Sequence, residues 1–138
     1  MKILGIDYGA ARIGLAVSDE DQTIAFPHSI VTPAEVFASV NTICVQEKIA
    51  LIVVGLPFNL SGKPTKETQE VAEFILQLKK AVAVPVMSED ERMTSILAEA
   101  LAGEKKKKRL GAGTKSAVAV DDVAAAMILQ SYLDRQKH

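Results

Sequence analysis

Short apolar runs that stop at polar residues mark the first part of the chain. Residues 2–7 form one such run, which ends at Asp7, and residues 12–18 form a second one after a short link. Runs of this length are typical of buried strands, and so short a link predicts an antiparallel hairpin. Residues 23–31 predict a third strand, in which Pro27 indicates an edge position or a bulge. We therefore expect three antiparallel strands at the start.

The pattern then alternates between helical and strand-like segments. Residues 32–48 begin with an N-cap hydroxyl, a proline at the first helical position and an acid at the third, which predicts a helix. Residues 50–55 form a continuous apolar run, typical of a strand buried on both faces of a parallel sheet. Four further elements are expected in the same way: a helix over 65–80, a strand over 82–87, and helices over 93–102 and 116–135.

This order of elements predicts an α/β fold in which helices flank one mixed five-stranded sheet. Three initial antiparallel strands are followed by parallel strands, and right-handed crossovers bring the C-terminal ends of the parallel strands to one rim. With 138 residues, about half of them apolar, the chain can bury one core without metal or disulfide staples. We find no repeat and no linker, so we expect a single domain over residues 1–138.

Composition argues against several classes of protein. No apolar run reaches the roughly 18 residues that a membrane span needs, and the first strand lacks the flanks of a signal peptide. The single cysteine, Cys44, cannot form an internal disulfide, and its apolar neighbours favour a buried thiol in a reducing cytosol. The two histidines, His28 and His138, are isolated, so a zinc site has no support.

Three acidic positions fall at the ends of predicted elements. Asp7 ends the first strand, Glu91 follows the last strand, and Asp121 or Asp122 begins the last helix. Each acid alone is more often a cap or a solvated turn residue, but this topology can collect all three at one rim. Clustered carboxylates need a cation, and such hard ligands select Mg²⁺ or Mn²⁺. A two-metal site of this kind activates water for phosphodiester hydrolysis. Helical spacing does not separate Asp121 from Asp122.

Basic residues supply candidate contacts to nucleic acid. Arg12 and Arg92 each have two interpretations, a contact with a phosphate or a salt bridge to one of the acids. Gly9, in the same link as Arg12, can take a positive φ and let a ligand approach the backbone. The net charge of −1 does not identify a polyanion as the partner. A solvated loop or a salt-dependent phosphate contact would both explain one cationic segment, whose members are Lys105, Lys106, Lys107, Lys108, Arg109 and Lys115.

Four sequence blocks together resemble those of a known protein family. They are G-I-D-Y-G-x-x-R-I-G-L-A-V-S-D at 5–19, V-V-G-L-P at 53–57, D-E-R-M-T-S at 90–95 and V-D-D-V-A-A-A-M-I-L at 120–129. In this order they resemble the YqgF/RuvX family of Holliday-junction-resolvase-like proteins, which are regarded as pre-16S ribosomal RNA nucleases. The resemblance implies a ribonuclease H-like fold, a cytoplasmic protein and a role in trimming the 5′ end of the small-subunit rRNA precursor.

The resemblance also implies roles for single residues. By position, the first acid of the family falls on Asp7, the second on Glu91 and the third on Asp121. Asp122 stands where many members carry a small polar residue, and it is an alternative metal ligand. The basic run at 105–109 lies where the family has a variable basic loop, which fits contact with substrate.

Two alternatives to a nuclease for the rRNA precursor stay open at this point. One is a resolvase that cleaves branched DNA with the same acids. The other is a ribosome-assembly factor that binds nucleic acid without cleaving it. The sequence also leaves both a monomer and a homodimer open.

Overall fold

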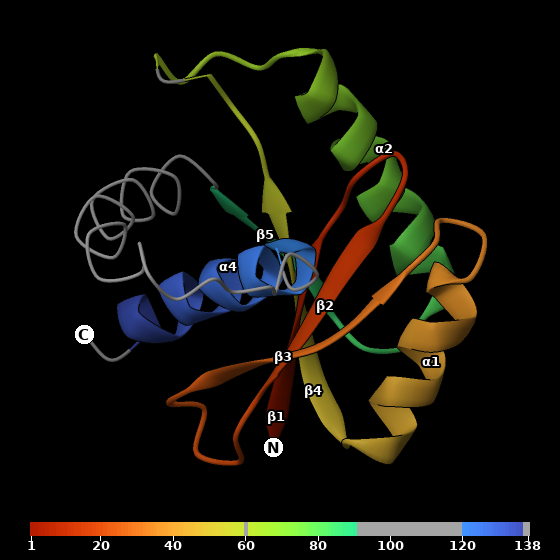
Figure 1. Cartoon of the computed structure of the whole chain (residues 1–138), viewed down its shortest axis with the longest axis vertical. Helices are drawn as coiled ribbons and strands as arrows, with labels where there is room; N and C mark the ends of the chain where they lie inside the picture. Colours follow the sequence, from red (N-terminus) through yellow and green to blue (C-terminus); the bar gives the residue numbers. More distant parts are fainter. Residues whose placement is uncertain (60, 91–119, 137–138) are drawn as a thin grey trace, which may run out of the picture.

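A computed structural model describes residues 1–59, 61–90 and 120–136 of the chain. Five strands form one twisted sheet in the spatial order β3-β2-β1-β4-β5, with helices on both faces (Figure 1). Among these residues, no helix is long and apolar enough to cross a membrane. The strands are β1 Lys2–Asp7, β2 Ile13–Ser18, β3 Ala25–Val31, β4 Ile49–Leu56 and β5 Val86–Asp90, and the helices are α1 Val36–Gln46, α2 Lys66–Ala81 and α4 Val120–Gln136.

Strand directions confirm the predicted mixed sheet. β1 pairs antiparallel with β2, and β2 pairs antiparallel with β3, so the chain does open with three antiparallel strands. β4 pairs parallel with β1, and β5 pairs parallel with β4. The C-terminal ends of β1, β4 and β5 therefore lie along one edge of the sheet, which we call the carboxyl rim.

Two predicted boundaries need correction: the start of the first helix and the range of the last strand. Helix α1 begins at Val36, because the capping residues before it form a separate turn: the Thr32 N–H donates to Glu35 Oε1 at 3.1 Å, and the Glu35 N–H donates to the Thr32 carbonyl at 3.0 Å. Strand β5 runs over 86–90 and not 82–87, because its backbone pairs with β4 as far as Asp90. Glu89, predicted to follow the strand, is thus part of it.

Two other local expectations hold, and a third is met only in part. Pro27 lies in the edge strand β3, and the pairing register with β2 shifts beside it, so both an edge position and an irregularity are present. Thr65 caps α2 in a reciprocal capping box with Thr68. Cys44 on α1 is half-buried rather than fully buried, and its burial raises the pKa of the thiol, which favours the unreactive protonated form.

Alternate residues of the strands supply two separate cores. One core lies between the sheet and the pair α1 and α2, and Leu4 and Ile6 of β1 belong to it. The other lies under α4 and includes Ile3 of β1. Figure 1 shows α4 on one side of the sheet and the other two helices on the opposite side. The described residues of this second core are apolar, and Ala16 and Val53 are among them.

Candidate active site

Asp7 ends β1 at the carboxyl rim and is half-buried. Side chains two residues apart on a strand point to the same face, so Asp7 lies on the face that Gly5 presents. A Cβ atom at Gly5 would lie 2.7 Å from Leu129 Cβ and 3.2 Å from the Ala125 carbonyl oxygen of α4. Gly5 therefore faces α4, and the Asp7 carboxylate lies on the α4 side of the sheet.

Glycines flank Asp7 on both neighbouring strands. Asp7 pairs with Gly14 of β2. The register between β1 and β4 pairs Ile6 with Val54, so the next position sets Gly55 beside Asp7. Because both positions are glycines, no side chain from these two strand positions lies beside the carboxylate. Gly55 in turn pairs with Glu89 of β5. We call this line of four residues, Gly14, Asp7, Gly55 and Glu89, the Asp7 row.

Glu89 is the second acid of the Asp7 row, and sequence reasoning did not single it out. Its side chain is buried, with 1% exposed, and it contacts two residues of α4. Glu89 Oε2 accepts from Ser131 Oγ at 3.1 Å, and Oε1 accepts from Arg135 at 2.5 Å. Burial raises the pKa of the Glu89 carboxyl, and the Arg135 charge and the Ser131 hydrogen bond oppose that rise. These two bonds engage both oxygens, so Glu89 joins strand to helix.

Helix α4 packs across the face of the sheet, in contact with β1, β2, β3 and β4. Gln130 of α4 bonds to the backbone of Thr23 and Ala25, at the end of the sheet where β1 begins. Ala125, earlier in the helix, lies over Gly5, which is closer to the rim. Ser131 and Arg135, nearer the C-terminus of the helix, meet Glu89 of the Asp7 row, so α4 crosses the sheet from Gly5 to β5.

The link between β1 and β2 differs from expectation at Gly9. The φ angle of Gly9 is not positive, so a left-handed conformation does not explain this glycine. A Cβ atom there would lie 2.6 Å from the carbonyl oxygen of Arg12, so the tight turn itself excludes a side chain. Arg12 is exposed at the rim. The Tyr8 ring packs on Phe74 of α2 with centroids 4.5 Å apart, which anchors the link.

The loop after β4 begins at the same rim and is ordered by its own polar groups. Asn59 Oδ1 accepts from the N–H groups of Ser61 at 3.0 Å and Lys63 at 2.9 Å, and from the Ser61 hydroxyl at 2.7 Å. Thr68 Oγ1 donates to the Pro57 carbonyl, which ties the loop to α2. Lys63 is exposed, and the sequence analysis did not select it as a candidate contact.

Several predicted site residues lie outside the described part of the chain. They are Glu91, Arg92, Lys105, Lys106, Lys107, Lys108, Arg109 and Lys115, together with the side chains of Asp121 and Asp122. The predicted helix over 93–102 and the charged segment over 104–115 lie outside it as well. Among the residues that are described, no three His, Cys, Asp or Glu side chains lie close enough to hold a metal ion. The predicted cluster of three acids therefore stays a prediction.

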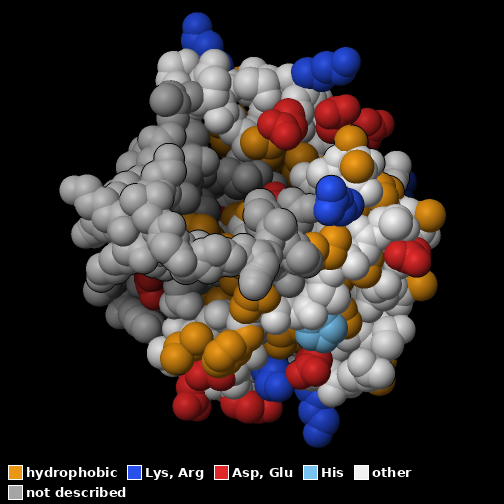
Figure 2. Space-filling view, in the orientation of Figure 1, with side chains coloured by type: hydrophobic (Ala, Val, Ile, Leu, Met, Phe, Trp, Pro, Cys, Tyr) orange, Lys and Arg blue, Asp and Glu red, His pale blue; other side chains and the backbone are white. Residues whose placement is uncertain are grey.

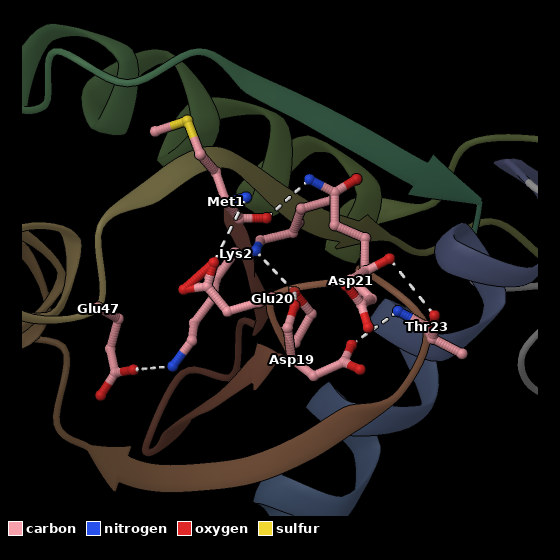
Figure 3. A network of polar contacts seen from close by, with 10 residues as sticks. Met1, Lys2, Asp19, Glu20, Asp21, Thr23 and Glu47 are labelled. Atoms are coloured by element: carbon pink, nitrogen blue, oxygen red, sulfur yellow. Dashed lines mark hydrogen bonds and ion pairs between the residues drawn. The ribbon is translucent and has the colours of Figure 1, made fainter.

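Acids at the opposite end of the sheet have partners within the chain (Figure 3). Glu47 Oε1 accepts from Lys2 Nζ at 2.8 Å, and Asp19 Oδ1 accepts from the Thr23 N–H at 2.7 Å. Figure 2 shows acidic side chains gathered beside lysine and histidine at this lower end. A hollow of about 390 Å³ here is lined by Lys2, Glu47 and His28 among others, and Asp7 does not line it. Internal pairing indicates a structural role for these acids.

Sequence comparisons identify relatives over the full length. The model of the RuvX family, described as Holliday junction resolvase, matches residues 1–135. A protein of Maridesulfovibrio salexigens named "Putative pre-16S rRNA nuclease" is 38% identical over 144 residues, covering 98% of this chain and 99% of that one. A protein of Anaplasma marginale with the same name is 39% identical over 140 residues, covering 99% and 86%.

Solved structures confirm the ribonuclease H-like fold. Thermus thermophilus RuvC in complex with a Holliday junction substrate superposes with a TM-score of 0.62 at 20% identity, over 99% of this chain and 96% of that one. The fowlpox virus resolvase bound to Holliday junction DNA superposes with a TM-score of 0.56 at 11% identity, over the whole of both chains. At such identities the likeness establishes the fold alone.

Proposed function

The chain belongs to the RuvX family of nucleases, and on that premise we propose that it hydrolyses phosphodiester bonds of structured RNA with Mg²⁺ or Mn²⁺. The proposed substrate is the 16S rRNA precursor, trimmed at its 5′ end in the cytoplasm by a single nuclease domain over residues 1–138. The observation that carries the proposal is the placement of Asp7, whose carboxylate lies on the α4 side of the carboxyl rim between two glycines. An acid in this position has no strand side chain on either side of it.

Carboxylates supply the proposed metal site. Asp7, Glu91 and Asp121 would hold the ion, with Asp122 as the alternative to Asp121. Their hard oxygen atoms fit Mg²⁺ or Mn²⁺ better than a softer metal. When bound, such an ion activates a water molecule and stabilises the leaving oxygen of the phosphodiester. The glycines beside Asp7 support this assignment because neither contributes a side chain that would compete for its carboxylate.

Cations near the rim supply the proposed contacts with the RNA backbone. Arg12 and Lys63 are exposed on the two links that leave the rim ends of β1 and β4. The predicted contacts of Arg92, of the run 105–109 and of Lys115 would extend this surface. Contacts with phosphate make binding weaken as salt concentration rises, whatever the RNA sequence.

Cleavage of an rRNA precursor by the purified full chain in Mg²⁺ tests the proposal. Asp7→Asn should reduce the rate at least about 100-fold, since a metal supplies several kcal/mol of transition-state stabilisation. Asp19→Asn is the matched control at the opposite end of the sheet, and it should cleave at the wild-type rate. Undiminished cleavage by a folded Asp7→Asn protein would sink the proposal.

A second candidate substrate is branched DNA. The solved structures with this fold include two complexes with Holliday junctions, which favours a test of that substrate. Cleavage of a four-way junction and of an rRNA precursor should be compared under the same conditions. We expect the precursor to be cleaved faster, and preferential cleavage of the junction would assign DNA as the substrate. Tight RNA binding without cleavage of either substrate would instead indicate an assembly factor.

A further inference from the structure

A polar contact made by a buried carboxylate joins the edge strand β5 to α4, and it has no part in the chemistry proposed above. Glu89 of β5 meets Ser131 and Arg135 of α4. We propose that these three residues form a clamp that positions α4 over the carboxyl rim, so that Glu89 is a positioning residue for the metal site. The inference rests on the proposed function, because it concerns the elements that carry the proposed ligands.

The burial of Glu89 argues that the clamp does more than stabilise the fold. Only 1% of the residue is exposed, and burying a carboxylate is unfavourable unless charge and hydrogen bonds compensate. Arg135 and Ser131 provide that compensation at 2.5 Å and 3.1 Å. A well-packed apolar residue often stabilises such a position equally well. What the polar contact adds is direction, since hydrogen bonds hold two elements in one relative orientation.

Among the described residues, no apolar core contact holds α4 on β5. The described core under α4 draws on Ile3, Ala16 and Val53 of β1, β2 and β4, and it includes no residue of β5. Met87, which pairs with Val53 and shares its side of the sheet, is 46% exposed. Among the residues that the structure describes, Glu89 is therefore the buried side chain by which β5 engages this helix.

The clamp connects the two elements that carry the second and third proposed ligands. Glu91 follows Glu89 by two residues, directly beyond the end of β5. Asp121 belongs to the helix that provides Ser131 and Arg135. Glu89 also lies in the Asp7 row, one strand beyond Gly55. A helix and a strand transmit a fixed orientation along their length, so a clamp at Glu89 constrains the spacing of both ends relative to Asp7.

Metal affinity is the readout that separates positioning from mere stability. Mn²⁺ binding to the full-length protein without RNA should be measured by isothermal titration calorimetry for wild type and Glu89→Gln. Residues that support metal ligands typically change affinity or activity about 10–100-fold, so we expect Glu89→Gln to weaken Mn²⁺ binding within that range. Cleavage should recover toward the wild-type rate at saturating Mg²⁺, because the ligands themselves remain.

Further variants make the test specific. Arg135→Met should weaken Mn²⁺ binding by a similar factor, and the double variant should be hardly worse than either single one, because both changes break one contact. Ser131→Ala removes one hydrogen bond only, and it replaces Glu89→Gln if that variant fails to fold. Glu47→Gln is the matched control, because it breaks a surface ion pair with Lys2 at the opposite end of the sheet. It should leave Mn²⁺ affinity unchanged.

The outcomes distinguish this inference from the proposed function. If wild type binds Mn²⁺ and cleaves RNA while folded clamp variants bind Mn²⁺ equally well, the clamp is structural only and the inference is wrong. If each clamp variant binds Mn²⁺ less tightly than wild type does, but wild type cleaves neither substrate, positioning stands and the proposed function fails. If wild type binds no Mn²⁺, both are wrong.

Discussion

The two faces of the sheet are made by the same strands and carry different chemistry. Toward α1 and α2, β1 presents Leu4 and Ile6, both completely buried among other large apolar side chains. Toward α4, the alternate positions of the same strand are Ile3, Gly5 and Asp7. On one face β1 thus contributes large apolar side chains. On the other face its residues change from apolar to glycine and then to an acid toward the carboxyl rim.

This difference separates stability from function. Large side chains on the α1/α2 face bury much apolar surface, and they contain no group that can bind a metal. Glycine on the α4 face lets the helix backbone come close, as the 2.7 Å from a Cβ at Gly5 to Leu129 Cβ indicates. Close approach sets α4 directly over the strand that ends at Asp7. Changes on the first face should alter how much protein is folded, and changes on the second should alter what the folded protein does.

Leu4→Ala on the α1/α2 face should have the largest effect on stability. Removing this fully buried side chain should lower the free energy of unfolding by about 2–5 kcal/mol. Cleavage per folded molecule should stay at the wild-type value at a temperature where the variant is folded. Urea unfolding and a rate assay on the same preparation measure both quantities. A folded Leu4→Ala protein with much slower cleavage would contradict the separation of the two faces.

Gly5→Ala on the α4 face should have a smaller effect on stability and a larger one on activity. The added methyl overlaps Leu129, and overpacking of this kind costs about 1–3 kcal/mol. Because α4 must move to relieve the overlap, both Mn²⁺ affinity and cleavage should fall. Chemical denaturation and calorimetry check the two effects.

Leu129→Ala provides the control for that overlap. In the double variant, the loss of unfolding free energy should be smaller than the sum of the losses in the two single variants, because the smaller residue at position 129 makes room for the methyl group. Strict additivity of the two changes in unfolding free energy would show that the close contact at Gly5 does not matter.

The pH dependence of the ion pair at the far end of the sheet should be the smallest effect. The hydrogen bond and charge of Lys2 lower the pKa of Glu47. The Glu47 carboxyl therefore binds a proton more readily in the unfolded chain than in the folded one. The ion pair stabilises the folded state above the unfolded pKa of about 4.3, and this stabilisation is lost as pH falls through the lower folded pKa. Glu47→Gln should be slightly less stable than wild type at neutral pH, and thermal unfolding should show this gap closing in acid. A gap that does not change with pH would contradict the assignment.

The fold could be predicted from the sequence because its signals are local. The apolar runs of β1, β2 and β4 and the cap at Thr65 each act within a few residues, and all of them hold in the structure. The start of α1 could not be placed, since Thr32 and Glu35 satisfy each other in a turn that also looks like a helix cap. The predicted end of β5 was wrong, because pairing with β4 extends the strand into acidic residues.

The environment of the candidate site could be predicted only in part. Asp7 stands out because a strand stops at it, but the glycines beside it come from β2 and β4 and are apparent only from the register. Glu89 could not be found, because its partner Arg135 is 46 residues away and nothing in the local pattern links them. The approach of α4 to Gly5 depends on packing between distant segments in the same way.

Binding of a divalent cation at Asp7 is the central claim, and calorimetric titration of Mn²⁺ into the full-length protein tests it most directly. Wild type should bind the ion, and Asp7→Asn should bind at least about tenfold more weakly, a loss of about 1.4 kcal/mol or more. Asp19→Asn should bind as wild type does, because that acid accepts hydrogen bonds in a turn at the other end of the sheet. Equal Mn²⁺ affinity of wild type and a folded Asp7→Asn protein would contradict the claim.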